Sequence, residues 1–99
     1  MFYRHYKGND YYMLGVVKQG VNEEKAKSYI PATHTESDQT INVFLYGNEF
    51  YANTDEKLVL YIDASGNYWL RPEEMFLGYV EVDGVQVRRF APYDPRTMN

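Results

Sequence analysis

The sequence predicts a mainly β protein, either a small curved antiparallel sheet or a partly open β-barrel, with one or two short helical turns. Two observations indicate this class. Six or seven short runs of β-branched and aromatic residues are separated by Gly, Asn and Asp residues typical of turns. The chain also has only 99 residues, which suits one domain over residues 1–99 and gives too few strands for a sandwich of immunoglobulin size.

The first half of the chain contains three predicted strands. Residues Tyr11 to Lys18 form an aromatic and β-branched run bounded by turn residues, and Thr40 to Tyr46 alternates apolar and polar side chains. After the turn signal Gly47-Asn48, we expect Glu49 to Ala52 to return as a short strand. Between the first two strands, Asn22 to Ser28 offers a cap followed by acidic and then basic residues, which favours a short helix ending before Pro31.

The second half predicts a hairpin and then a helical turn. Residues Lys57 to Asp63 place three aliphatic side chains on one face, and Ala64-Ser65-Gly66-Asn67 turns the chain into Tyr68 to Arg71. The next segment, Arg71 to Gly78, starts with Pro72 and two glutamates and ends with Gly. Proline and acidic residues favour the first turn of a helix, so we predict one helical turn here. We expect Met75 and Phe76 to fill the core.

A second hairpin is predicted from Tyr79 to Arg88. Its centre, Asp83-Gly84, suits a two-residue type I′ turn, which needs positive φ at both positions. That register pairs Val82 with Val85 and Val80 with Val87, so four valines share one face, which we expect to be buried. The other face then pairs Tyr79 with Arg88 and Glu81 with Gln86.

Composition excludes several classes of protein. Hydrophobic residues make up 44% and charged residues 24% of the chain, which is a globular balance. There is no cysteine, so disulfides, thiolate zinc sites and thiol catalysis are excluded. The net charge of -4 argues against nucleic acid as a partner. No apolar run approaches the roughly 18 residues of a membrane span and no signal peptide opens the chain, so we expect a cytoplasmic protein without a membrane partner.

Signatures of catalysis and of metal binding are mostly absent. The chain lacks a phosphate-binding loop, a Ser elbow and a paired-His zinc helix. The side chains of His34, Glu36 and Asp38 alternate and are compatible with a metal site, but a polar loop with a solvated His explains them as well. The adjacent Glu73 and Glu74 point apart on a helix, so helix capping explains them better than a glycosidase pair. We predict no catalytic residue, no metal and no cofactor.

Aromatic and cationic residues alternate near the N-terminus. In an extended chain, Tyr3, His5 and Lys7 lie on one side and Arg4 and Tyr6 on the other. Such a mixture can stack a base and pair with phosphate. The alternative is structural: the arginine pairs with an internal carboxylate and the tyrosines wall the core.

The same residue types return in the second half of the chain. Trp69 and Arg71 share one face of their strand, and only one of Arg88 and Arg89 can face a site. For Arg71, as for Arg4, the alternative is a structural role in which the guanidinium pairs with an internal carboxylate. If the two segments meet, they form a single ligand surface, for which the candidate residues are Tyr3, Arg4, His5, Tyr6, Lys7, Trp69, Arg71 and Arg89.

These motifs resemble those of domain-of-unknown-function family 1653, which is found in bacteria and phages. The opening Tyr3-Arg4-His5-Tyr6-Lys7-Gly8, followed by Leu14-Gly15, is similar to that family's start. Its second block, Trp-x-Arg-Pro-x-x-Met-Phe, corresponds to residues 69–76, and residues 79–90 resemble its closing hairpin, with Arg88 where proline is common. The resemblance covers residues 2–18 and 57–90 and implies a small β-rich fold without an established activity.

The middle of the chain departs from the family pattern. His34-Thr35-Glu36-Ser37 is similar to the family's His-Ser-Glu-Thr stretch, but the chain between Leu14-Gly15 and Trp69 is much longer than is usual in the family. We interpret residues 34–56 as an inserted hairpin. Residues 36–63 carry six acidic side chains against one basic side chain, so the insertion is acidic.

Three functions are compatible with the sequence. The first is a non-enzymatic binding module for a small anionic ligand, nucleotide-derived because aromatic faces stack a base while guanidinium groups hold phosphate. A phage protein that sequesters a host nucleotide signal would be one example. The second is a protein-interaction module, either a homodimer or a domain that docks a basic partner through its aromatic and acidic surface. The third is an enzyme acting on nucleotides, with His5 or His34 as the acid-base group.

Overall fold

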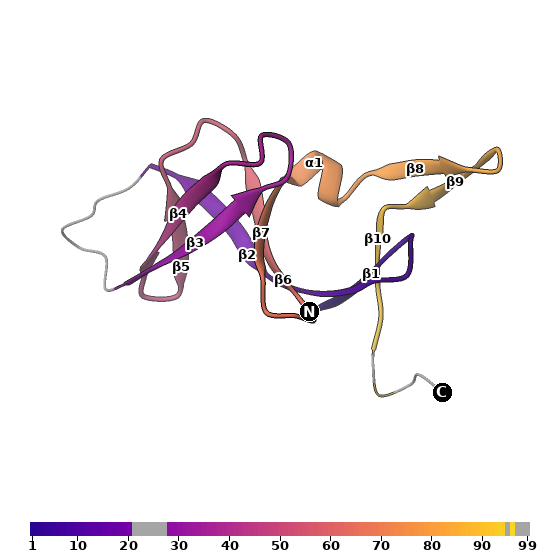
Figure 1. The fold of residues 1–99 in the computed structure, drawn as a ribbon, viewed down its shortest axis with the longest axis horizontal. Coiled ribbons are helices and arrows are strands. Elements are labelled where there is room, and N and C mark those ends of the chain that lie inside the picture. The colour runs from indigo at the N-terminus through magenta and orange to yellow at the C-terminus, as the bar shows by residue number, and fades with distance from the viewer. Residues whose placement is uncertain (21–27, 95, 97–99) are drawn as a thin grey trace.

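Six strands form a closed barrel, and the remaining strands extend from it (Figure 1). The computed structural model describes residues 1–20, 28–94 and 96. The strands are β1 (Phe2–His5), β2 (Asp10–Gln19), β3 (Ser28–His34), β4 (Thr40–Tyr46), β5 (Glu49–Ala52), β6 (Leu58–Asp63), β7 (Tyr68–Pro72), β8 (Tyr79–Val82), β9 (Val85–Arg88) and β10 (Phe90–Pro92), and the helix is α1 (Glu73–Phe76). The mainly β class is therefore confirmed.

The barrel runs in the order β2-β5-β4-β3-β7-β6 and closes where β6 pairs with β2. Two of its strand pairs, β2–β5 and β3–β7, are parallel. Of the two predicted forms, a curved antiparallel sheet or a partly open barrel, the structure has a barrel, and this barrel is closed. Its two parallel pairings are long-range and join hairpins that local patterns cannot connect. A bulge between Met13 and Gly15 shifts the register of β2 against β6.

The predicted elements of the second half are confirmed. Both hairpins form, and Val82 pairs with Val85 across a turn in which Asp83 and Gly84 have φ of 51° and 78°. The helical turn begins at Glu73, with Pro72 as its cap residue. In the first half, the interval predicted as a helix lies outside the described residues, apart from Ser28, which begins β3.

The predicted acidic hairpin contains β4 and β5, which pair in antiparallel fashion. These two strands are part of the barrel wall, since β5 also pairs with β2 and β4 with β3. The segment is therefore integral to the barrel.

Apolar side chains form two separate cores. The first fills the barrel and includes Val17, Val43, Leu58, Leu60 and Leu70, all at most 1% exposed. The second lies on the outer face of β6 and consists of Val59, Tyr61, Phe76 and Phe90, which we call the outer core. The alternation of β6 explains both, because its even-numbered leucines point into the barrel while its odd-numbered residues point out.

Two segments cover the outer core. Helix α1 supplies Phe76, and β10, which pairs with β1, supplies Phe90. In Figure 1, β1 and β10 lie beside the barrel, and the β8–β9 hairpin projects away from it beyond α1. The valine face of this hairpin is not fully buried as expected: Val82 is 38% and Val85 61% exposed, because the hairpin pairs with no strand of the large sheet.

Candidate functional site

Three cationic or titratable side chains from distant parts of the chain meet beside the outer core. They are His5, Arg71 and Arg89, which we call the cationic cluster. The charges of both arginines act on His5. The side chain of Phe90 lies beside two of them: its ring centroid is 4.9 Å from that of His5 and 5.2 Å from the Arg71 Cζ.

The strand geometry explains why these residues converge. Alternation along β1 turns Tyr3 and His5 toward the outer core, and β7 pairs Arg71 with Val59, whose side chain also belongs to that core. The third member, Arg89, is anchored by its backbone. Its N–H donates to Gly78 O, and its carbonyl accepts from the N–H of Tyr6 (3.0 and 2.9 Å).

Neither arginine of the cluster has a carboxylate partner among the described residues. The ion pairs found there include neither Arg71 nor Arg89. The Nε atoms of both are buried and have no hydrogen-bond acceptor in the described part of the chain. A buried donor without an acceptor costs about 1–3 kcal/mol, and more when it is charged, so an anion at this position would be stabilised.

Two titratable neighbours of the arginines, Tyr61 and His5, are uncharged at neutral pH. Burial raises the pKa of Tyr61 to about 12, against a smaller opposing effect of Arg71, so its hydroxyl keeps its proton. Burial, followed by the charges of Arg71, Arg89 and Lys7, lowers the pKa of His5 from its ordinary value of 6.5, so the ring is neutral at neutral pH. Its Nδ1 accepts from the Lys7 N–H (3.2 Å), which assigns the proton of the neutral ring to Nε2.

One carboxylate lies near the cluster. The charge of Glu36 acts on Tyr61, although Glu36 is exposed and is not among the ion-paired residues of the described chain. Its effect on Tyr61 ranks below those of burial, Arg71 and Tyr11. The local charge at the cluster is therefore dominated by its arginines, in contrast to the net charge of the chain.

The predicted clamp residue Arg4 lies on the other face of β1. Its Nε and an Nη donate to the two carboxylate oxygens of Asp10 (2.7 and 3.2 Å), and its Cζ stacks 4.7 Å from the Tyr93 ring centroid. The pairing raises the pKa of Arg4 and lowers that of Asp10. The expectation that Arg4 and Arg71 form one clamp is therefore corrected: cross-strand pairing of Arg4 with Asp10 supplies the internal carboxylate.

The predicted aromatic platforms separate into buried and exposed rings. Tyr3 packs edge-on against Phe76 at 5.1 Å. Trp69 packs against the outer core and donates its indole N–H to Asp63 (2.9 Å). Only Tyr6 leaves much of its ring exposed, 40%, beside His5. The remaining predicted residue, Lys7, is exposed 5.8 Å from the Tyr6 ring centroid.

An apolar groove that the sequence did not indicate adjoins the cluster. Its volume is about 550 Å³, and it lies between the valine face of β8–β9 and the turn after β1. Its walls include Tyr6, Val82, Val87, Arg88, Ala91 and Tyr93, and His5 also lines it. We call it the hairpin groove. The four alternating valines of the hairpin were the sequence feature that could have indicated this groove. Alternation alone, however, cannot distinguish the wall of a groove from the face of a buried core.

The other predicted histidine, His34, has a structural role. It is only 5% exposed, so the interpretation as a solvated loop residue is wrong. Its Nδ1 accepts from the Ser37 N–H (3.1 Å), and its Nε2 therefore donates to Glu56 (3.0 Å). These bonds fasten the turn after β3 to the segment before β6. Within residues 1–20, 28–94 and 96, no group of three His or acidic side chains is arranged to hold a metal.

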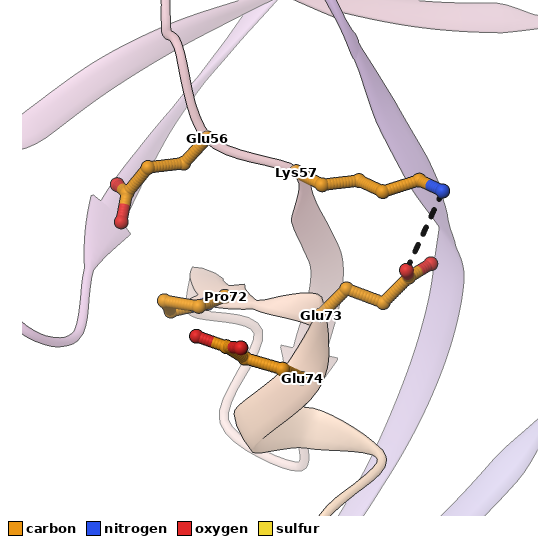
Figure 2. A pocket seen from close by; sticks show the side chains of 5 residues that line it. All are labelled: Glu56, Lys57, Pro72, Glu73 and Glu74. Carbon is orange, nitrogen blue, oxygen red and sulfur yellow. Dashed lines mark ion pairs between the residues drawn. The ribbon is translucent and has the colours of Figure 1, made fainter.

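A further hollow beside α1 is lined largely by acidic residues. Figure 2 shows Glu56, Glu73 and Glu74 around it, with Lys57 directed toward Glu73. The Lys57–Glu73 pair is 3.6 Å long, and Glu56 is the partner of His34. Both Glu73 and Glu74 lie in the first turn of α1, as predicted, but the helix has no side-chain capping hydrogen bond.

The fold and its surface define a small β-barrel domain with a donor-rich cluster beside a second aromatic core. Residues 46–92 match the model of the family described as Protein of unknown function (DUF1653). This match confirms the resemblance to domain-of-unknown-function family 1653 over the part of the chain that holds Trp69, Arg71 and Arg89. No curated protein and no solved structure matches the chain significantly. Among the described residues, no helix has the length and apolar character needed to cross a membrane.

Proposed function

We propose that this protein is a non-enzymatic binding module for a small anionic, nucleotide-derived ligand. The observation that carries the proposal is the pair of arginines, Arg71 and Arg89, whose buried Nε donors lack an acceptor among the described residues. Guanidinium groups bind phosphate through parallel charge-assisted hydrogen bonds. The Nε2–H of His5 adds a neutral donor beside them.

The net charge of -4 does not oppose this role. A small ligand responds to the charges within about a Debye length, roughly 8 Å at physiological salt, rather than to the whole chain. The charges of both arginines act on His5 and lower its pKa. A small anion is therefore a better fit than a long nucleic acid, which would also meet the six acidic side chains of residues 36–63.

The proposal is tested by thermal unfolding of the full chain with a panel of anions at constant ionic strength. Sulfate, phosphate, pyrophosphate and nucleoside mono-, di- and triphosphates are compared with chloride. A ligand at 100 times its Kd adds about 2.7 kcal/mol to the free energy of unfolding, which a shift in Tm reports. If no member of the panel raises Tm above the chloride control, the proposal fails. Consumption of a nucleotide over time would instead indicate the enzyme alternative.

Sulfate binding is expected to strengthen as the pH falls below neutrality. In the free protein the pKa of His5 is lowered by burial and by the two arginines. A bound anion offsets the arginine charges and raises that pKa, so binding takes up a proton. The affinity should rise as the pH falls through the His5 pKa of the complex and level off below the pKa of the free protein. Each unit between the two pKa values corresponds to about tenfold in affinity.

Isothermal titration calorimetry from pH 8 to pH 5 measures this effect, and sulfate is the appropriate probe because it does not titrate in that range. His5→Gln is the variant, and its affinity should lose the pH dependence. Persistence of the same pH dependence in His5→Gln would assign the proton to another group.

A protein-interaction module is the second candidate function. It is favoured by apolar side chains that remain exposed around the hairpin: Leu77 at 48%, Tyr79 at 59% and Val85 at 61%. Tyr79 and Val85 lie on opposite faces of the β8–β9 hairpin, and a second copy docked on either face would bury apolar area. A homodimer of this kind would show a mass that increases with protein concentration in sedimentation equilibrium.

A further inference from the structure

The hairpin groove and the cationic cluster share a wall. His5 lines the groove and also belongs to the cluster. The backbone carbonyl of Arg89 accepts from Tyr6, whose ring lines the groove, so the two sites are held together through the main chain. A small ligand at one site therefore lies next to the other.

The chemistry of the groove differs from that of the cluster. One wall presents Val82 and Val87 and the other the ring of Tyr6, which is 40% exposed. The described lining includes the cationic side chains of Arg4 and Arg88 but no carboxylate. Its volume of about 550 Å³ falls within the roughly 300–1,000 Å³ of small-molecule sites, which are typically apolar and aromatic with a few polar groups.

We propose that the hairpin groove holds the planar heterocycle of a nucleotide whose phosphate lies at the cationic cluster. This inference rests on the proposed function and adds to it the place and the chemistry of the uncharged part of the ligand. An aromatic ring would stack on Tyr6 and pack against the valines, while the arginines of the cluster hold the phosphate. Arg88 adds a cation to the lining of the groove, whereas the charge of Arg4 is already paired with Asp10.

Four compounds separate the two parts of the site. Inorganic phosphate and ribose 5-phosphate carry the anion alone, adenosine carries the heterocycle alone, and adenosine monophosphate carries both. By calorimetry on the full chain, we expect adenosine monophosphate to bind at least about tenfold more tightly than ribose 5-phosphate, as base stacking on an aromatic side chain predicts. Equal affinities of these two compounds would overturn the inference. Failure of every phosphate compound to bind would overturn the proposed function itself.

The variant Val87→Ser removes apolar surface from the groove and leaves the cluster intact. It should abolish the preference for adenosine monophosphate while ribose 5-phosphate binds as before. The matched control is Val85→Ser, on the same hairpin face but outside the described groove lining, and it should keep the preference. A preference unchanged in Val87→Ser would overturn the assignment.

A measurement on the unaltered chain tests the same assignment without depending on whether Val87→Ser folds. In methyl NMR spectra, adenosine monophosphate should shift the Val82 and Val87 signals, and ribose 5-phosphate should not. If these signals depend on protein concentration and not on nucleotide, a second copy occupies the groove and the inference is wrong.

Discussion

Replacement of Phe76 by alanine is expected to lower the free energy of unfolding by about 3–5 kcal/mol, the usual cost of deleting a buried aromatic ring. The ring is fully buried and stacks on Phe90 at 4.2 Å with an interplanar angle of 11°. It also contacts Tyr61 and Tyr3 at 5.3 and 5.1 Å between centroids. Its removal therefore leaves a cavity in the middle of the outer core.

Urea unfolding followed by the fluorescence of Trp69 measures this loss, because that indole packs against the outer core. The matched control is Leu77→Ala at the adjacent position. That side chain is 48% exposed, so its loss should cost less than about 1 kcal/mol. A Phe76→Ala variant no less stable than Leu77→Ala would show that α1 does not hold the outer core together.

The register of the β8–β9 hairpin could be predicted because it is encoded locally. Asp83 and Gly84 both take the positive φ that a type I′ turn needs, and this fixes every pair from Val82–Val85 to Tyr79–Arg88. The location of the hairpin could not be predicted in the same way. Its exposure depends on the absence of a neighbouring strand, which is a property of the whole fold.

Strand β3 was not predicted, although Pro31 correctly excluded a helix at that point. A proline is tolerated in a strand where no partner needs its missing N–H. The antiparallel partner β4 pairs Pro31 with Asn42, but the parallel partner β7 pairs with β3 only at Thr33 and His34. One side of the strand is therefore unpaired at the proline. Closure of the barrel depends on such long-range pairings, which the sequence alone does not reveal.

The face of β1 that packs on the outer core could be predicted from alternation, since Tyr3 and His5 do lie on one side of the strand. Lys7 does not continue that pattern, because the chain turns directly after His5. The sequence also did not indicate which of the two arginines, Arg4 or Arg71, would have a carboxylate partner. The pairing of β1 with β2 places Asp10 opposite Arg4, whereas β7 places the apolar Val59 opposite Arg71. Arg71, which lies opposite an apolar residue, is therefore the better candidate for binding an anion than Arg4, which already has a carboxylate partner.

Replacing Arg71 or Arg89 by glutamine is expected to weaken binding of phosphate compounds about 10- to 100-fold, the equivalent of losing a charge-assisted hydrogen bond of about 1.5–3 kcal/mol. Calorimetric titration with pyrophosphate measures the loss. The control is Arg96→Gln, because Arg96 is exposed and paired with Asp94 (2.9 Å), away from the cluster in sequence and contacts. Its affinity for pyrophosphate should equal that of the unaltered chain.

Stability distinguishes a binding role of these arginines from a structural one. Removing one partner of a buried ion pair normally destabilises a protein, but Arg71 and Arg89 have no such partner among the described residues. In the absence of an anion, Arg71→Gln and Arg89→Gln should therefore unfold at a Tm close to that of the unaltered chain, because relief of the repulsion between two neighbouring cations offsets lost contacts such as that of Arg71 with the Phe90 ring. In saturating pyrophosphate the order should reverse, with the unaltered chain now the most stable. A lower Tm of both variants without anion, combined with undiminished pyrophosphate affinity, would make these arginines part of the scaffold and not of a binding site.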